Sequence, residues 1–151
     1  MKEVNTKIVK YLFIGFIMEV VVDTNIIISS LIKPGITRKI IAEFGLSFIT
    51  PAYTLSEINK YKEEICKKAN FLDEEFKVML NLIFKYIKII NPAIYDDYLE
   101  EAKDIIKDVK DIPFIATAIA FNSIIWSDDT HFKKQKIIKV LNTREMMNLF
   151  Q

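Results

Sequence analysis

Cysteine, histidine, glycine and arginine are all scarce in this chain of 151 residues. The single cysteine, Cys66, leaves no partner for an intrachain disulfide or a cysteine zinc cluster, and it fits a reducing, cytoplasmic setting. The chain has no Gly-Lys-Ser/Thr loop and no Gly-x-Gly-x-x-Gly motif, which argues against nucleotide-binding enzymes of those two types. Guanidinium groups occur only at Arg38 and Arg144, so phosphate contacts would fall mainly to lysines, which act as point charges.

Charge of one sign is also lacking, because the formal net charge is only +1. No global basic field therefore points to a nucleic-acid partner. The hydrophobic fraction of 51%, with 11 Phe and 6 Tyr, argues against disorder. A chain of this length is most simply one domain with a core of its own.

An N-terminal extension, residues 1–17, precedes the domain that we expect over residues 18–151. Its polar, basic start and short apolar run imitate a secretion signal, but the run is too short to span a bilayer and no cleavage pattern follows. We therefore expect no membrane association. The extension is best interpreted as an extra helix or strand; the alternatives are a true start at Met18 or a targeting segment.

The rest of the chain alternates between strand and helix patterns. Continuous apolar or β-branched runs predict five short strands, at residues 19–23, 46–50, 87–90, 123–127 and 137–141. Helical spacing predicts helices between them, including one unbroken helix over residues 54–70 and a final helix capped by Thr143. This alternation predicts a three-layer α/β domain with a central parallel sheet.

Acidic residues recur where a predicted strand ends or a predicted helix begins. The four positions are Asp23, Glu57, Asp111 and Asp129. In a parallel α/β sheet these ends share one edge, where ligands bind. Carboxylates gathered there repel one another and stay ionised together only if a cation joins them, which predicts a site for Mg²⁺ or Mn²⁺.

Four segments carry a resemblance to a known family: Val-Val-Asp-Thr-Asn, Ser-Glu, Asp-x-Pro-Phe-Ile-Ala-x-Ala and Ile-Trp-Ser-Asp-Asp-x-x-Phe. In this order and spacing they are similar to the PIN-domain nucleases, over about residue 18 to the C-terminus. The resemblance implies a Rossmann-like sheet and an Mg²⁺- or Mn²⁺-dependent ribonuclease. Many small members are VapC-like toxins held by an antitoxin.

The resemblance also implies roles for individual residues. The catalytic quartet would be Asp23, Glu57, Asp111 and Asp129. Asp23 and Asp111 would be the principal metal ligands, and Asp129 would bind metal or orient water. Further positions would support the site or replace a member of it: Asn25, Ser127, and Asp128 as an alternative to Asp129.

Each of these acids also has a structural interpretation. Asp23 and the Asp128–Asp129 pair are compatible with ordinary turns. Thr54-Leu-Ser-Glu57 matches a capping box, so the sequence pattern leaves function and capping equally open for Glu57. Asp111 is placed to cap a helix, and the nearby Asp108 is easily confused with it. His131, the only histidine, is interpreted as loop structure.

Other enzyme classes fit less well. Haloacid-dehalogenase-type phosphatases need a second aspartate where this chain has Asn25, and receiver domains need an acidic pair on the first strand. The main rival is a PIN-like scaffold that binds RNA or protein without cutting. We expect a homodimer, and the series Phe71, Phe76, Leu80 and Phe84 is interpreted as core or dimer surface. A lysine group on the predicted third helix is interpreted as a solvated face: Lys60, Lys62, Lys67 and Lys68.

Overall fold

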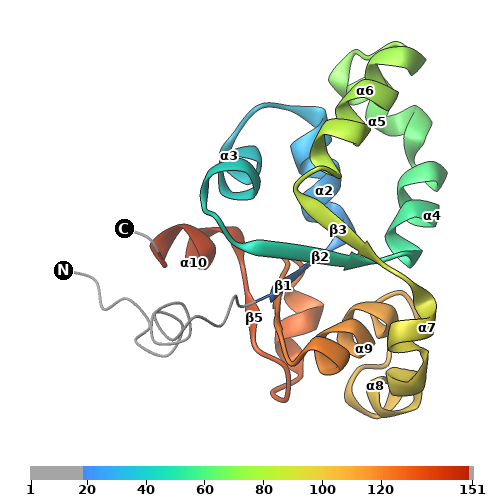
Figure 1. Ribbon diagram of the computed structural model, residues 1–151, viewed down its shortest axis with the longest axis vertical. Helices are drawn as coiled ribbons and strands as arrows, with labels where there is room; N and C mark the ends of the chain where they lie inside the picture. Colours follow the sequence, from blue (N-terminus) through green and yellow to red (C-terminus); the bar gives the residue numbers. More distant parts are fainter. Residues whose placement is uncertain (1–18, 150–151) are drawn as a thin grey trace.

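A five-stranded parallel sheet forms the centre of the molecule in the computed structural model, which describes residues 19–149. The strand order is β3-β2-β1-β4-β5, so the first strand is central and β3 and β5 are the two edges (Figure 1). The strands are β1 (Glu19–Val22), β2 (Ser47–Pro51), β3 (Ile87–Ile90), β4 (Ile124–Trp126) and β5 (Val140–Leu141). The predicted parallel α/β fold is confirmed.

Helices cover both faces of this sheet and make the fold three-layered (Figure 1). One face is covered by α2 (Thr24–Ile32), α3 (Ile36–Glu43), α4 (Tyr53–Lys60), α5 (Lys62–Ala69), α6 (Asp73–Ile83) and α10 (Thr143–Asn148). The other face is covered by α7 (Pro92–Tyr95), α8 (Leu99–Ile105) and α9 (Ile112–Phe121), with the short 3₁₀ helices η1 (Asp96–Tyr98) and η2 (Thr130–Lys134) in the connections.

The apolar run of β1 explains its central place. Val20, Val21 and Val22 are all fully buried. Because side chains alternate along a strand, Val20 and Val22 join the core on the α2 and α3 side, whereas Val21 joins the core under α9. A strand that is apolar on both faces fits only where helices lie above and below it.

Two sequence predictions of helix structure are wrong in detail. The helix predicted over residues 54–70 is two helices, because the backbone of Tyr61 leaves the helical range and ends α4 before α5 begins. The final helix is capped by Asn142, whose side chain accepts a hydrogen bond from the Glu145 amide, and Thr143 is the first helical residue.

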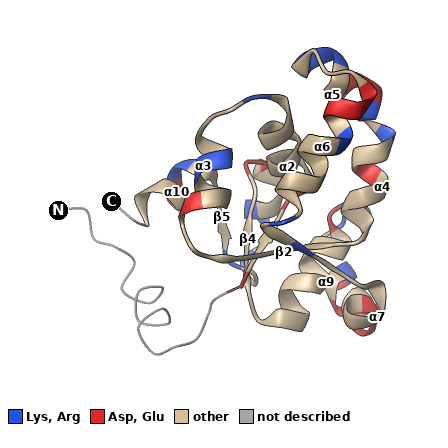
Figure 2. Cartoon of the chain, turned by 45° about the horizontal axis from the view of Figure 1, so that its top comes forward, with Lys and Arg blue, Asp and Glu red and all other residues tan. Residues whose placement is uncertain are grey.

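The phenylalanine series belongs to the core. Phe76 is buried, and Phe71, Leu80 and Phe84 are partly buried against the same cluster. Nearby lysines are engaged in ion pairs: Lys62 pairs with Asp73, and Lys68 pairs with Glu64 at 2.8 Å. Figure 2 shows the resulting mixture of charge on α5.

The N-terminal extension lies outside the described residues. Over residues 19–149, no helix has the length and apolar character needed to cross a membrane.

Candidate active site

Strand register places Asp23 beside Ser127. Val22 pairs with Trp126, so the residues that follow them lie next to each other where β1 and β4 end. The amide of Asp23 donates to the Trp126 carbonyl at 3.0 Å, and the Ser127 hydroxyl donates to Oδ2 of Asp23 at 2.7 Å. Two residues that are 104 positions apart in the chain are thereby fixed in one buried contact.

Glu57 reaches the same edge of the sheet from α4, which follows β2. Its Oε1 accepts a hydrogen bond of 2.6 Å from the hydroxyl of Thr24, the residue after Asp23. The hydroxyl of Thr54 contacts those of Thr24 and Thr50 at 3.2 and 2.7 Å. The capping-box interpretation is therefore wrong, since Ala52 caps α4 and neither Thr54 nor Glu57 serves that cap.

Asp111 stands at the start of α9. It holds the cap position by its backbone, but its side chain makes no capping hydrogen bond. Pro113 lies in the first turn, where proline removes no needed donor. Asp111 is only 8% exposed, and its Oδ2 is buried without any hydrogen-bond partner. Such an orphaned carboxylate oxygen is costly unless something absent from the protein itself satisfies it.

Asp129 is tied to Asp23 through Ser127. The amide of Asp129 donates to the Ser127 hydroxyl at 3.0 Å, and this same hydroxyl donates to Asp23. Oδ1 of Asp129 accepts from the His131 amide at 2.9 Å, which starts η2. Asp129 thus makes a structural hydrogen bond and also lies near enough to Asp23 and Asp111 for its charge to raise their pKa values.

Asp128 is directed elsewhere. Its Oδ1 accepts from the Thr143 amide at 2.7 Å, and its Oδ2 accepts from the Thr143 hydroxyl at 2.8 Å. Both oxygens therefore stabilise the first turn of α10. This geometry favours Asp129 over Asp128 as the fourth acid.

Replacing Asp128 by alanine is expected to destabilise the protein by about 1 kcal/mol, because the lost contacts serve a helix start, and to leave unchanged the RNA cleavage that the sequence resemblance implies. The matched variant Asp129→Asn is expected to lower activity with a smaller change in stability. Urea denaturation and RNA cleavage, measured on both variants at a temperature where they are folded, check this pair. Loss of cleavage in folded Asp128→Ala would reverse the assignment.

Electrostatics at the site are dominated by burial and by repulsion between carboxylates. Burial, with smaller contributions from Glu57 and Asp129, raises the pKa of Asp23 to about 6, although the Ser127 hydroxyl opposes the rise. The pKa of Asp111 is raised to about 7, mainly by burial. The negative charges of four neighbouring carboxylates add to the rise: Asp108, Asp129, Asp23 and Glu57. A divalent cation fits this set, because it would satisfy the orphaned oxygen and remove the repulsion.

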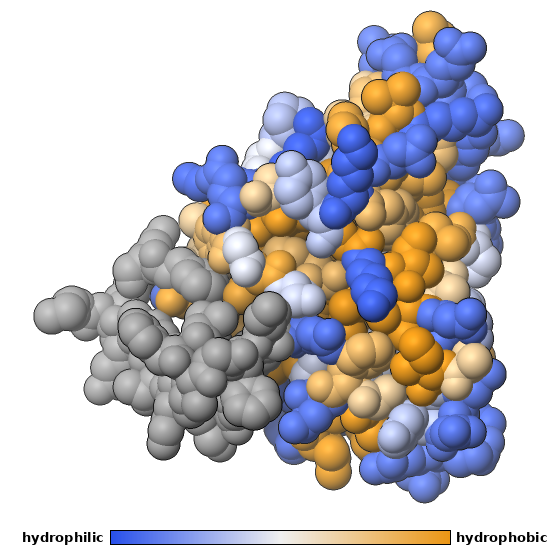
Figure 3. Space-filling model, in the orientation of Figure 1, coloured by the Kyte–Doolittle hydropathy of each residue, from blue (hydrophilic) through white to orange (hydrophobic). Residues whose placement is uncertain are grey.

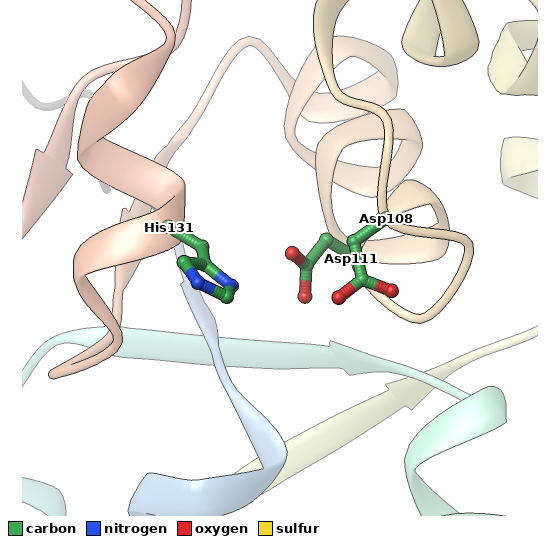
Figure 4. A group of neighbouring side chains, drawn as sticks. All are labelled: Asp108, Asp111 and His131. Carbon is green, nitrogen blue, oxygen red and sulfur yellow. The ribbon is translucent and has the colours of Figure 1, made fainter.

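Two residues near Asp111 were not among the expected site residues. One possible ligand atom from each of Asp108, Asp111 and His131 lies within 4.8 Å of the other two (Figure 4). Asp108 precedes Asp111 by three residues and was not itself predicted to belong to the site. His131 was interpreted as loop structure, and no local pattern signals its approach to α9.

Asn25 lines a different hollow from Asp111. It is exposed on the first turn of α2 and lines a hollow of about 200 Å³ with Tyr61 and Lys68. Asp111 instead lines a different hollow, of about 390 Å³, with Asp108 and His131.

Comparison with known proteins places this geometry in a family. The PIN domain family matches residues 21–150. The fold is similar to the solved structure of VapBC2 from Rickettsia felis bound to a DNA fragment from their promoter, with a TM-score of 0.65 and 20% identity over 83% of this chain and 98% of that one. It is also similar to FitAcB from Neisseria gonorrhoeae, with a TM-score of 0.57, 20% identity and the same coverage of both chains. No curated protein matches the sequence. From the extent of the family match, the chain belongs to the PIN domain family.

Proposed function

We propose that this protein is a metal-dependent endoribonuclease that hydrolyses phosphodiester bonds in RNA with Mg²⁺ or Mn²⁺. The observation that carries the proposal is the group of carboxylates at the carboxyl edge of the sheet, in which Asp23 and Asp111 are buried and Glu57 and Asp129 are half-buried. The charged neighbours that most strongly raise the pKa of Asp111 are all carboxylates. In a scaffold that does not catalyse a reaction, these neighbouring carboxylates would lower the stability of the fold without a functional gain.

Asp23, Asp111 and Asp129 are the residues that would hold the cation, with Glu57 as the fourth catalytic acid. A divalent cation supplies two things to phosphodiester hydrolysis: neutralisation of the phosphate charge and a lower pKa for the attacking water. The chain itself supplies orientation. Ser127 fixes one oxygen of Asp23, and Thr24 fixes one oxygen of Glu57, so both carboxylates are held before substrate arrives.

Glu57→Gln is the variant that tests the proposal, since it removes one negative charge at nearly constant volume. Cleavage of an unstructured, end-labelled RNA is expected with Mg²⁺ or Mn²⁺ and not with EDTA. In Glu57→Gln the rate should fall by at least about tenfold, because even outer partners of a metal site contribute about 10- to 100-fold.

Glu74→Gln is the matched control, because Glu74 is exposed in the first turn of α6 and is not among the groups that shift the pKa of Asp23 or Asp111. It should retain full activity, and both variants should keep the melting temperature of the wild type within a few degrees. Equal cleavage by Glu57→Gln and wild type would remove Glu57 from the catalytic set. No metal-dependent cleavage by wild type would favour the binding-module alternative.

We further propose that the enzyme is the toxin of a toxin–antitoxin pair, acts in the cytoplasm and forms a homodimer. The first of these is supported by the similarity of the fold to VapBC2 from Rickettsia felis and to FitAcB from Neisseria gonorrhoeae. Exposed apolar side chains near the edge strand β3 offer surface for protein contacts, among them Leu82, Tyr86, Ile89 and Ile94 (Figure 3). A small partner gene that overlaps or adjoins this one would support the toxin role.

A further inference from the structure

His131 comes together with Asp108 and Asp111, which lie three residues apart in an earlier part of the chain. His131 lies in η2, Asp108 lies in the turn before α9, and Asp111 is the cap residue of that helix. One ligand atom of each lies within 4.8 Å of the others, and Figure 4 shows the imidazole ring facing the Asp111 carboxylate, with the Asp108 carboxylate next to it. The three side chains line one hollow of about 390 Å³.

The two carboxylates in this hollow have no cationic ion-pair partner among the described residues. Among residues 19–149, no lysine or arginine forms an ion pair with Asp108 or Asp111, although Lys107 and Lys134 line the same hollow. Oδ2 of Asp111, the residue shared with the proposed catalytic centre, is buried without a hydrogen bond, and Asp111 is only 8% exposed. A buried oxygen of this kind marks a place that a ligand from outside the chain would fill.

Local hydrogen bonds hold the other two groups in position. Oδ1 of Asp108 accepts from the Lys110 amide at 3.1 Å, which fixes its carboxylate in the turn before α9. The His131 amide donates to Asp129 at 2.9 Å, and Nδ1 of its ring lies 3.8 Å from the same oxygen. These contacts hold the backbone of His131 and the carboxylate of Asp108 beside the hollow.

We propose that Asp108, Asp111 and His131 form a second cation site, which takes a divalent transition-metal ion such as Mn²⁺ in preference to Mg²⁺. The imidazole nitrogen decides the preference, because Mg²⁺ favours oxygen ligands and retains its waters, whereas transition metals accept nitrogen readily. The second site extends the proposed function, since it shares Asp111 with the proposed catalytic centre. It places a second positive charge beside the hollow that Lys107 and Lys134 border.

Electron spin echo measurements on bound Mn²⁺ test the proposal directly. His131 is the only histidine in the chain, so in protein without an affinity tag any imidazole-nitrogen modulation of the Mn²⁺ signal must arise from this residue. Wild type is expected to show that modulation in the presence of excess Mg²⁺. His131→Ala should lose it, and Asp108→Asn should weaken Mn²⁺ binding at this site by about tenfold or more.

Two controls separate this inference from the proposed nuclease activity. Asp23→Asn should keep the nitrogen modulation, because Asp23 is not a ligand of the second site. Asp104→Asn, which changes an exposed residue of α8, should behave as wild type. Absence of nitrogen modulation in wild type that cleaves RNA with Mn²⁺ would overturn the second site alone. If wild type never cleaves RNA, but nitrogen modulation is present in it and survives in Asp23→Asn, the nuclease proposal would be overturned and the second-site proposal would stand. Full Mn²⁺ affinity in folded Asp108→Asn would also overturn the second site.

Discussion

Asp23→Asn is expected to reduce metal-dependent RNA cleavage by at least about 100-fold, more than is typical for residues that only orient a ligand. The substitution removes a ligand charge and nearly preserves volume. Its side-chain oxygen can still accept the hydrogen bond from Ser127, so the fold should persist. Cleavage rates of wild type and variant over a range of Mg²⁺ and Mn²⁺ concentrations measure the effect.

The control for this substitution is Asp104→Asn, which removes the same charge from an exposed position on α8. It should cleave as wild type does. Full cleavage by rigorously purified Asp23→Asn would contradict the assignment of Asp23 as a metal ligand. A loss shared equally by both variants would point to net charge rather than to the site.

Without metal, the wild-type protein is expected to lose stability as pH rises from 5 to 8. Burial raises the pKa of Asp23 from 3.8 to about 6 and that of Asp111 to about 7, so the folded state binds these protons more tightly than the unfolded state. The stabilisation is complete below the unfolded pKa of 3.8 and is lost as pH rises through the folded values. The two carboxylates interact, and together they should lower the free energy of unfolding by about 1 to 3 kcal/mol between pH 5 and pH 8.

Urea denaturation in EDTA at the two pH values measures this loss. The informative quantity is the difference between wild type and Asp23→Asn, because it removes the contributions of all other titrating groups. Carboxylates with lowered pKa values, such as Glu145, affect stability mainly at and below their usual pKa of 4.5. The variant should be less sensitive to pH and more stable than wild type at pH 8. Saturating Mg²⁺ should restore stability to wild type and have less effect on Asp23→Asn. A pH-independent difference between the two proteins would show that the buried charge of Asp23 has no cost.

The sheet was predictable from sequence because its signals are local. The valine run of β1 is apolar at every position, and only a strand covered on both faces suits such a run. The division of the predicted long helix was not predictable, since neither glycine nor proline marks Tyr61, where α4 ends. Its backbone is set by tertiary packing rather than by a local breaker.

The candidate site shows the same contrast. Asp23, Glu57 and Asp111 were identified because each follows a strand or opens a helix. The hydroxyl of Thr54 was misinterpreted as a cap because its actual neighbour Thr24 lies 30 positions earlier in the chain. His131 and Asp108 escaped notice for the same reason, since their approach depends on how η2 packs beside α9.

Trp126 gives the molecule an optical property of its own. It is the only tryptophan, it is fully buried, and its indole N–H donates to the Thr143 hydroxyl at 3.0 Å. Its neighbour Ser127 holds Asp23, so the single indole chromophore lies one residue from the carboxylate cluster. Unfolding must transfer this indole from an apolar surrounding to water, which shifts its emission. The protein thus carries an intrinsic fluorescent reporter at the edge of the sheet where its chemistry is proposed, and needs no attached dye.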